Sequence, residues 1–382
     1  MRIAIVLSLL ALPLLAQQQE PTFDDAWDLY MRGRLTEAAA AYQALLQKNQ
    51  NFAGGWYEMG LVQKDLRHFQ QAVQSFTRAT TINNQLASAW AELGATQVAL
   101  QNWDQAIPVL QNAVKLDNKN AEAFANLGYA MWQKADPDNG EKMLKQAIKL
   151  DPTLVAAYVD LGNLYMKLAK NPQGLDLLRK GFELDPLDKR AVNSYTKAVV
   201  DFGSERDKAF MTAWQNEANG KYKEAEDALV KLTAADSSDF RALALLGSVY
   251  LHQEPPKPND AITCYLDALE QNGKAKSADK LPAGSLAFAV EGLGIAYMKV
   301  NEWGKAEEQF KKGMTVDKDN AWLPYDLALV YAAQAKGTNA ISSLADACKL
   351  DAQMADEAKD DPGFETLKTN KDFQKLLALY GD

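Results

Sequence analysis

Side chains capable of nucleophilic or acid–base chemistry are few in this sequence. It contains two His, His68 and His252, and two Cys, Cys264 and Cys348. Histidine is the commonest general acid or base, and a Cys thiolate can act as a nucleophile or a metal ligand. His68 falls in an expected turn, no carboxylate or Cys cluster surrounds His252 in sequence, and both Cys lie among apolar residues. A Cys in such a place usually behaves as a small buried hydrophobe, so these residues predict neither catalysis nor a metal site.

The motifs of common catalytic and nucleotide-binding sites are also missing. The sequence has no Walker loop, no Gly-x-Gly-x-x-Gly, no Gly-x-Ser-x-Gly and no His-Glu-x-x-His. Carboxylates are plentiful, but no two of them stand out as an acid and base pair. We therefore expect no catalytic residues, no cofactor and no bound metal, and a protein that is not an enzyme.

Length and charge limit the class of protein further. The chain has 382 residues, which is more than one compact core usually holds, so several domains or a repeat array are expected. Lys and Arg number 41 against 50 Asp and Glu, which gives a net charge of −9. A chain this acidic has no global attraction for nucleic acid or for an anionic membrane surface. We expect no nucleic-acid partner.

The first residues have the pattern of a secretory signal peptide. Arg2 precedes a mostly apolar run over 3–15, and Ala16 stands before the polar residues that begin at Gln17. The run is shorter than the roughly 20 residues that span a bilayer. The pattern predicts cleavage near Ala16, export to the periplasm or the secreted space, and no stable membrane insertion after cleavage. An uncleaved anchor is the alternative.

A 34-residue period runs through most of the remaining chain. Glycines recur at this spacing, each with an aromatic residue four positions before it and a small residue twelve positions after it. The glycines are Gly60, Gly94, Gly128 and Gly162; the aromatics are Trp56, Trp90, Phe124 and Tyr158; the small residues are Ala72, Ala106, Gly140 and Gly174.

This pattern resembles the tetratricopeptide repeat, in which two antiparallel helices pack through these positions. Small residues let the two helices approach closely, and the aromatic fills the space between neighbouring repeats. The resemblance implies an all-α fold, a right-handed α-solenoid (superhelix) of about nine helix-turn-helix repeats with a C-terminal capping helix.

The repeat frame divides the chain into segments. The half repeat is expected either to cap the first array or to act as a hinge at Gly203, and the alternative is one diverged helix pair over 189–218. The segments are a signal peptide at 1–16, five repeats at 19–188, the half repeat at 189–205, two repeats at 206–275, a linker at 276–286, two repeats at 287–354 and a cap at 355–382.

In this family the first helices of the repeats line a concave surface that binds extended peptides or partner helices. The Lys and Asn pattern by which one subfamily grips a C-terminal carboxylate is not met here. The lining positions instead hold aromatic and acidic residues, although each aromatic has the alternative role of packing helices together. The resemblance implies a partner-binding groove at Phe23, Trp27, Tyr30, Tyr57, Glu58, Glu92, Glu122, Asn126, Tyr129, Trp132, Asp160 and Asn163, with further lining residues at Phe210, Trp214, Arg241, Trp322, Tyr325 and Asp326.

The leading functional hypothesis is a non-enzymatic protein–protein interaction scaffold of the cell envelope or secreted space. Its groove would bind a peptide or partner helix with an apolar segment and basic flanks. The alternative is a glycan-binding accessory protein of polysaccharide export, because Tyr and Trp on a curved surface can stack on sugar rings. The sequence does not identify the partner.

Overall fold

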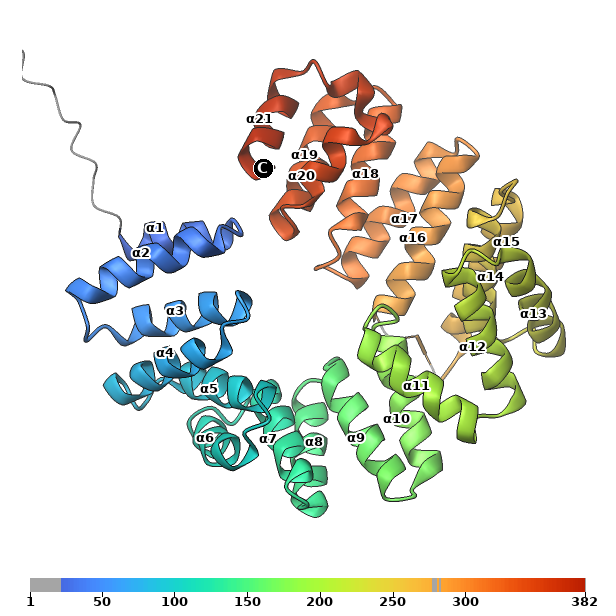
Figure 1. Ribbon diagram of the computed structural model, residues 1–382. Helices are drawn as coiled ribbons and strands as arrows, with labels where there is room; N and C mark the ends of the chain where they lie inside the picture. The colour runs from blue at the N-terminus through green and yellow to red at the C-terminus, as the bar shows by residue number, and fades with distance from the viewer. Residues whose placement is uncertain (1–21, 277–279, 282, 382) are drawn as a thin grey trace, which may run out of the picture.

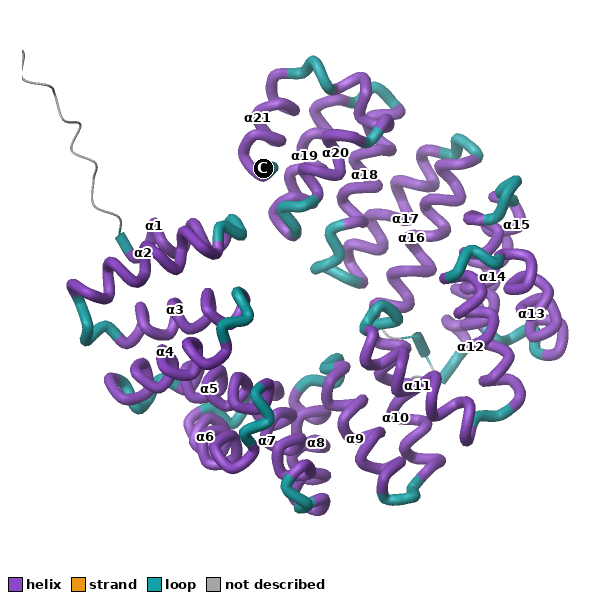
Figure 2. Tube along the Cα trace, viewed as in Figure 1, coloured by secondary structure: helices purple, strands orange, loops and turns teal. Residues whose placement is uncertain are grey.

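The computed structural model describes residues 22–276, 280–281 and 283–381. The predicted signal peptide at 1–16 lies outside the described residues. Within the described ranges the regular structure is helical and no strand occurs (Figure 2). None of the helices there is long and apolar enough to cross a membrane. The helices follow one another around an open ring whose ends are α1 and α21 (Figure 1).

Five antiparallel helix pairs make up the first array of the described chain. They are α1 (Phe23–Met31) with α2 (Leu35–Lys48), α3 (Ala53–Asp65) with α4 (Phe69–Ile82), α5 (Ala87–Ala99) with α6 (Trp103–Leu116), α7 (Ala121–Gln133) with α8 (Pro137–Leu150), and α9 (Val155–Lys167) with α10 (Asn171–Leu184).

One unpaired helix and four further pairs follow, and the chain ends in short helices. They are α11 (Lys189–Phe202), α12 (Glu205–Ala218) with α13 (Tyr222–Ala235), α14 (Phe240–His252) with α15 (Pro258–Lys274), α16 (Ala283–Lys299) with α17 (Trp303–Val316), α18 (Trp322–Ala333) with α19 (Gly337–Leu350), then α20 (Met354–Asp360), the 3-10 helix η1 (Pro362–Leu367) and α21 (Lys371–Tyr380).

The glycines of the period lie where two helices of a pair touch. A Cβ added at Gly128 would lie 2.8 Å from the carbonyl oxygen of Gly140, and one at Gly140 would lie 2.9 Å from that of Gly128. The same addition at Gly94 would meet the Leu110 side chain at 2.4 Å. Only a residue without a side chain permits these approaches, so the spacing of small residues sets the closeness of the helices.

The turn inside most pairs contains one residue with a left-handed backbone. These residues recur at the same repeat position, but only two of them are glycine. A left-handed conformation costs other L-residues about 1–2 kcal/mol, so the pair geometry imposes it there. The glycines are Gly33 and Gly220, and the others are Arg67, Gln101, Ala135, Ala169, Asn301 and Ala335.

The half repeat is an internal layer of the stack. The Asp188 carboxylate accepts a hydrogen bond of 2.7 Å from the Ala191 backbone N–H and caps the start of α11. The buried face of α11 packs against α9 and α10, and Met211 of α12 joins the same cluster. Because α12 pairs with α13 rather than α11, residues 189–218 are not one helix pair. Since α12 covers this cluster, α11 is not an exposed end.

The predicted linker at 276–286 is shorter in the structure, because α16 begins at Ala283. The first turn of α16 contacts the end of α10. The Ser285 hydroxyl donates a hydrogen bond to the carbonyl oxygen of Glu183. The Glu183 side chain in turn pairs with Arg241 of α14, with 2.6 Å between Oε1 and Nε. The end of α10 thus contacts α14 and α16, which come later in the chain.

The C-terminal segment covers the last pair with three short elements rather than one capping helix. Phe364 of η1 and Phe373 and Leu376 of α21 are buried in the same cluster as Leu344 of α19. Pro362 starts η1 after α20 has ended at Asp360, because proline cannot continue a helix. The apolar face of the last repeat is therefore not left bare.

Candidate functional site

The first helix of each pair lies beside the first helix of the next pair. Contacts of this kind join α1 to α3, α3 to α5, α5 to α7, α7 to α9 and α9 to α11, and again α12 to α14, α14 to α16 and α16 to α18. The predicted groove residues of the first array all belong to these first helices. Their surroundings differ from repeat to repeat.

In the first repeat, Trp27 is the aromatic residue most available to a partner. Its side chain is 37% exposed, and its ring lies 5.1 Å from that of Tyr30. The Tyr30 hydroxyl donates a hydrogen bond of 2.8 Å to Asp65 Oδ2 of α3. Phe23 instead packs edge-on against Phe52, with 4.7 Å between ring centroids. Phe23 therefore contributes mainly to packing.

The second repeat places Tyr57 and Glu58 on the row with both side chains half-buried. The Tyr57 ring lies 6.0 Å from that of Phe76 in α4, so part of it serves the helix contact. Burial and the nearby Asp24 carboxylate raise the pKa of Glu58 above its usual range. This carboxylate would be easier to ionise with a cation beside it.

Two of the predicted acidic residues already have a cationic partner within the chain. Glu92 Oε2 lies 2.7 Å from Lys64 Nζ of the preceding repeat. Asp160 forms an ion pair with Arg190 of α11. Burial raises the pKa of Asp160 to about 7, and the Arg190 guanidinium opposes that shift. Both pairs weaken the attraction for a basic segment that the sequence suggests in this array.

The fourth repeat brings Tyr129 and Trp132 together, 5.8 Å apart and edge to face. Tyr129 also packs against Trp103 at 5.7 Å. A Cβ at Gly140 would come within 3.2 Å of the Trp132 Cβ, so Trp132 lies on the contact between α7 and α8. Of the remaining predicted residues, Glu122 is exposed, Asn126 is half-buried, and the Asn163 amide donates to the Ser194 hydroxyl at 3.2 Å.

The second half of the row carries exposed aromatics and three acidic residues. Trp322 at the start of α18 is 46% exposed, and Phe288, 34 residues earlier in the same repeat position, is 47% exposed. Asp326 lies one turn beyond Trp322, and Glu291 and Asp361 lie close enough to affect its charge. Sequence reasoning missed Phe288, Glu291 and Asp361, although their repeat positions could have found the first two.

The remaining predicted residues of this half face internal contacts. Trp214 packs edge-on against Phe182 of α10, with 5.4 Å between ring centroids, and Phe210 is half-buried beside the same cluster. Arg241 is held by the ion pair with Glu183. These residues join the two arrays instead of lining a free surface.

A Ser, His and Glu cluster on α12 and α14 was not expected from the sequence. The Ser248 hydroxyl donates a hydrogen bond of 2.8 Å to Glu217 Oε1, and His252 Nδ1 lies 3.2 Å from the same oxygen. Ser248 is only 2% exposed, and its oxygen lies 3.3 Å from the same His252 Nδ1, which faces Glu217 as well. With both groups bonded to the carboxylate, His252 Nδ1 acts as a donor and is not free to take the Ser248 proton. An activated nucleophile needs the opposite arrangement, so this cluster links two helices.

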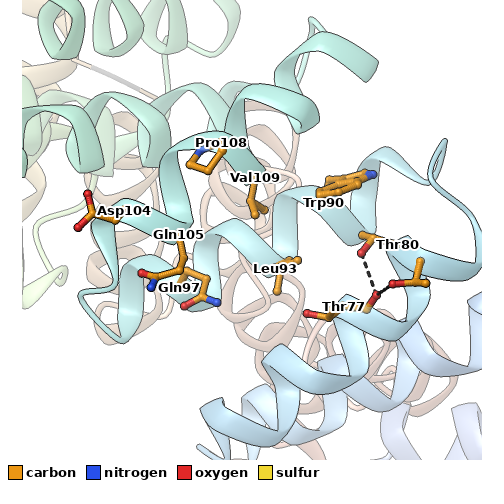
Figure 3. A pocket seen from close by; sticks show the side chains of 10 residues that line it. Thr77, Thr80, Trp90, Leu93, Gln97, Asp104, Gln105, Pro108 and Val109 are labelled. Atoms are coloured by element: carbon orange, nitrogen blue, oxygen red, sulfur yellow. Dashed lines mark hydrogen bonds between the residues drawn. The ribbon is translucent and has the colours of Figure 1, made fainter.

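A groove of about 550 Å³ lies away from this row, between α4, α5 and α6 (Figure 3). Trp90, Leu93 and Val109 give it an apolar wall, while the Thr80 and Thr81 hydroxyls donate to the carbonyl oxygen of Thr77. Its one charged lining residue, Asp104, pairs with Lys134 at 2.8 Å. Within the described chain, no group of three His, Cys, Asp or Glu residues has an arrangement that could hold a metal ion.

Sequence profiles of known families match several of these helix pairs. Profiles described as tetratricopeptide repeat match residues 53–86, 121–154 and 210–276, and one described as TPR repeat matches residues 97–134. The α-solenoid predicted from the sequence is thereby confirmed. No protein of curated function matches this chain in sequence.

Solved structures with a similar fold align with parts of the chain. YrrB, described as a TPR protein with an unusual peptide-binding site, is 23% identical over 45% of this chain and 89% of its own, with a TM-score of 0.40. MamA from Desulfovibrio magneticus is 22% identical over 44% and 94%, with a TM-score of 0.40. A thermophilic TPR protein from Thermus thermophilus is 21% identical over 47% and 97%, with a TM-score of 0.39.

Proposed function

We propose that this α-solenoid of tetratricopeptide repeats is a non-enzymatic scaffold that binds a protein partner, as an extended peptide or a helix, along its row of first helices. Solenoids of stacked repeats present such rows as extended binding surfaces. The observation that carries the proposal is the pair of exposed tryptophans on this row, Trp27 and Trp322, at 37% and 46% exposure. Trp is one of the residue types enriched among the side chains that carry most of the binding energy at protein interfaces.

The non-enzymatic part of the proposal is supported by the chemistry of the polar clusters. Ser248 and His252 both form hydrogen bonds to Glu217. A catalytic triad instead needs the Ser hydroxyl to donate to the His ring and the His ring to donate to the carboxylate. Burial raises the pKa of the Cys264 thiol to about 12, which keeps it protonated and unreactive at neutral pH. The geometry of these groups suits a structural role.

The proposal includes export, with the mature chain starting near Gln17. Its support is the sequence pattern of Arg2, the apolar run and Ala16. Intact-mass measurement on protein recovered from the envelope or secreted fraction is expected to show a chain that starts near Gln17. Recovery of the protein only from the cytosol with Met1 retained would contradict it.

The binding proposal is tested by capture from envelope extracts with the full chain as bait. A Trp27→Ala and Trp322→Ala double variant is expected to lose the captured partner, because both exposed anchors are gone. Leu187→Ala is the matched control, since Leu187 is 87% exposed in the turn between α10 and α11. If the folded double variant captures the same proteins as the parent, the row is not the binding surface. Capture of a polysaccharide instead would favour the glycan alternative.

A further inference from the structure

Three carboxylates gather on the second half of the row without a cation beside them. They belong to Glu291 of α16, Asp326 of α18 and Asp361 before η1. Glu291 accepts a hydrogen bond of 3.1 Å from the Asn320 amide, and Asp361 accepts one of 2.9 Å from the Tyr325 hydroxyl. Both donors are neutral. Among the described residues, no Lys, Arg or His forms an ion pair with any of the three, so no internal cation stabilises their ionised forms.

Among the three, Asp326 has the least favourable surroundings for a negative charge. Burial, followed by the Glu291 and Asp361 carboxylates, raises its pKa well above the usual range. An enclosed carboxylate normally has a hydrogen-bond donor or a cation, because its burial is otherwise unfavourable. A positive group brought between the three would stabilise their ionised forms and supply the missing partner.

Two exposed aromatic side chains lie next to these carboxylates. Phe288 is on α16, one turn before Glu291, and Trp322 is on α18, one turn before Asp326. The Trp322 ring is braced edge-on by Tyr325 at 5.4 Å. Asn320 links α16 to the start of α18. Its side-chain oxygen accepts a hydrogen bond of 2.9 Å from the Trp322 backbone N–H, and its side-chain NH₂ donates to Glu291. One surface therefore combines apolar anchors with carboxyl groups that have no internal cation.

The first array differs in this respect. Its carboxylates Glu92 and Asp160 are neutralised by Lys64 and Arg190. The same repeat position is occupied by Gly292 and Asp326 in the last two repeats, and Asp326 has no ion pair with a Lys, Arg or His within the described residues. Glu58 and Glu122 of the first array also have no ion pair within the described residues, but α16, α18 and the residue before η1 bring three such carboxylates together.

We propose that α16, α18 and the residue before η1 form the docking surface for a basic segment of a protein partner. A Lys or Arg of that segment enters among Glu291, Asp326 and Asp361, and its apolar neighbours cover Phe288 and Trp322. Charge complementarity selects the segment, and the aromatic faces add apolar burial and cation–π attraction. The inference rests on the proposed binding function and specifies the class of partner and the repeats that hold it.

The occupant is a side chain on a peptide rather than a metal ion. The carboxylates are not arranged as a group that could hold a metal, within the residues that the structure describes. A Lys or Arg side chain has a long apolar stem and a charged end, so it can contact Trp322 and the carboxylates at once.

The test uses the full chain and a defined probe. The probe is a fluorescein-labelled synthetic peptide of alternating Leu and Lys, and its matched control replaces every Lys with Glu. Fluorescence anisotropy at physiological salt is expected to show binding of the Lys peptide and much weaker binding of the Glu peptide. Asp326→Asn keeps the size of the side chain and removes the charge, so we expect a dissociation constant at least about tenfold higher. Trp322→Ala is expected to have a similar effect.

Matched variants outside this surface separate this inference from the proposed function. Leu187→Ala, in the exposed turn between α10 and α11, is the control and is expected to leave the affinity for the Lys peptide within about twofold. Trp27→Ala reports separately on the first array, and thermal melts check that every variant is folded. Unchanged affinity in folded Asp326→Asn would overturn the docking surface. A loss confined to Trp27→Ala would overturn it and still support binding along the row. No preference for the Lys peptide would also overturn it, whereas the capture experiment tests the proposed function independently.

Discussion

Trp27 and Trp132 both lie on first helices, but their surroundings assign them different roles. Trp27 is in ring contact with Tyr30 and leaves more than a third of its surface to solvent. Trp132 packs against Tyr129 and lies over Gly140 of the second helix. At this scale, the side chain opposite a residue decides whether an aromatic stabilises the stack or remains available to a partner.

Truncating these two residues is expected to separate their roles. Trp132→Ala should lower the free energy of unfolding by about 2 kcal/mol, which is less than the cost for a fully buried Trp because its ring is only half-buried. Trp27→Ala should change it by less than about 0.5 kcal/mol. Urea unfolding followed by circular dichroism measures both. An unfolding free energy of Trp132→Ala equal to that of the parent would show that Trp132 is a surface residue.

Gly128 gives a second prediction at the residue scale. A methyl group there would meet the Gly140 carbonyl oxygen at 2.8 Å, so α7 and α8 would have to move apart. Gly128→Ala is expected to destabilise the protein by about 2 kcal/mol. Gly304→Ala in α17 is the matched control, because nothing lies within 4 Å of an added Cβ. It is expected to be neutral or to stabilise by about 0.5 kcal/mol. Equal thermal melts of the two variants would contradict this.

At the scale of the helices, a carboxylate on a second helix ties its repeat to the next one. Glu141 of α8 accepts hydrogen bonds from Lys145 at 2.6 Å, the Tyr165 hydroxyl of α9 at 2.9 Å and Lys170 at 3.2 Å. These hydrogen bonds lower the pKa of Glu141 to about 2, and the bond from Lys145 has the largest effect. Burial of the carboxyl group acts in the opposite direction. A similar arrangement recurs near the end of the array, where Glu307 accepts hydrogen bonds from Lys311 and the Tyr331 hydroxyl. Lys336 lies over the Tyr331 ring.

The lowered pKa of Glu141 predicts a pH-dependent contribution to stability. A carboxyl group with a lower pKa in the folded state stabilises the fold above its unfolded pKa, and that contribution is lost as the pH falls through the folded pKa. Glu141→Gln should therefore cost about 2 kcal/mol at pH 7 and progressively less from about pH 4.5 down to about pH 2. Urea unfolding across this range measures it, with exposed Glu122→Gln as the control. A constant difference at all pH values would contradict the network.

At the scale of the whole molecule, the end of α10 joins the two arrays. The buried Glu183 carboxylate pairs with Arg241 of α14, its backbone carbonyl accepts from Ser285 of α16, and Phe182 beside it packs against Trp214 of α12. These contacts join residues up to 102 positions apart in the chain. The described helices therefore form one continuous stack across the interruption at α11.

Breaking the central ion pair tests this continuity. Arg241→Gln leaves Glu183 charged and buried, and we expect a loss of about 3 kcal/mol in the free energy of unfolding. Adding Glu183→Gln should recover part of that loss, because the unpaired charge is then removed. Arg179→Gln is the control, since its pair with Asp176 is exposed and contributes about 0.5 kcal/mol or less. Strict additivity in this double-mutant cycle would mean that the pair does not hold the arrays together.

The sequence alone determined the repeat architecture. Gly60, Gly94, Gly128 and Gly162 recur every 34 residues because each helix pair needs the same close contact, and this contact is made between residues of one repeat. Such local packing leaves a periodic pattern that can be read without coordinates. The helix pairs, their order and the row of first helices follow from that pattern.

The tertiary structure alone decided which residues of the row are free. The cations that neutralise Glu92 and Asp160 come from neighbouring repeats, at positions that the period does not mark. The partners of Glu183 lie farther away still, and the left-handed turn residues are imposed by pair geometry on ordinary residues such as Ala135. Charge pairing, exposure and backbone strain depend on distances between segments far apart in the chain, whereas the repeat pattern records contacts within one unit.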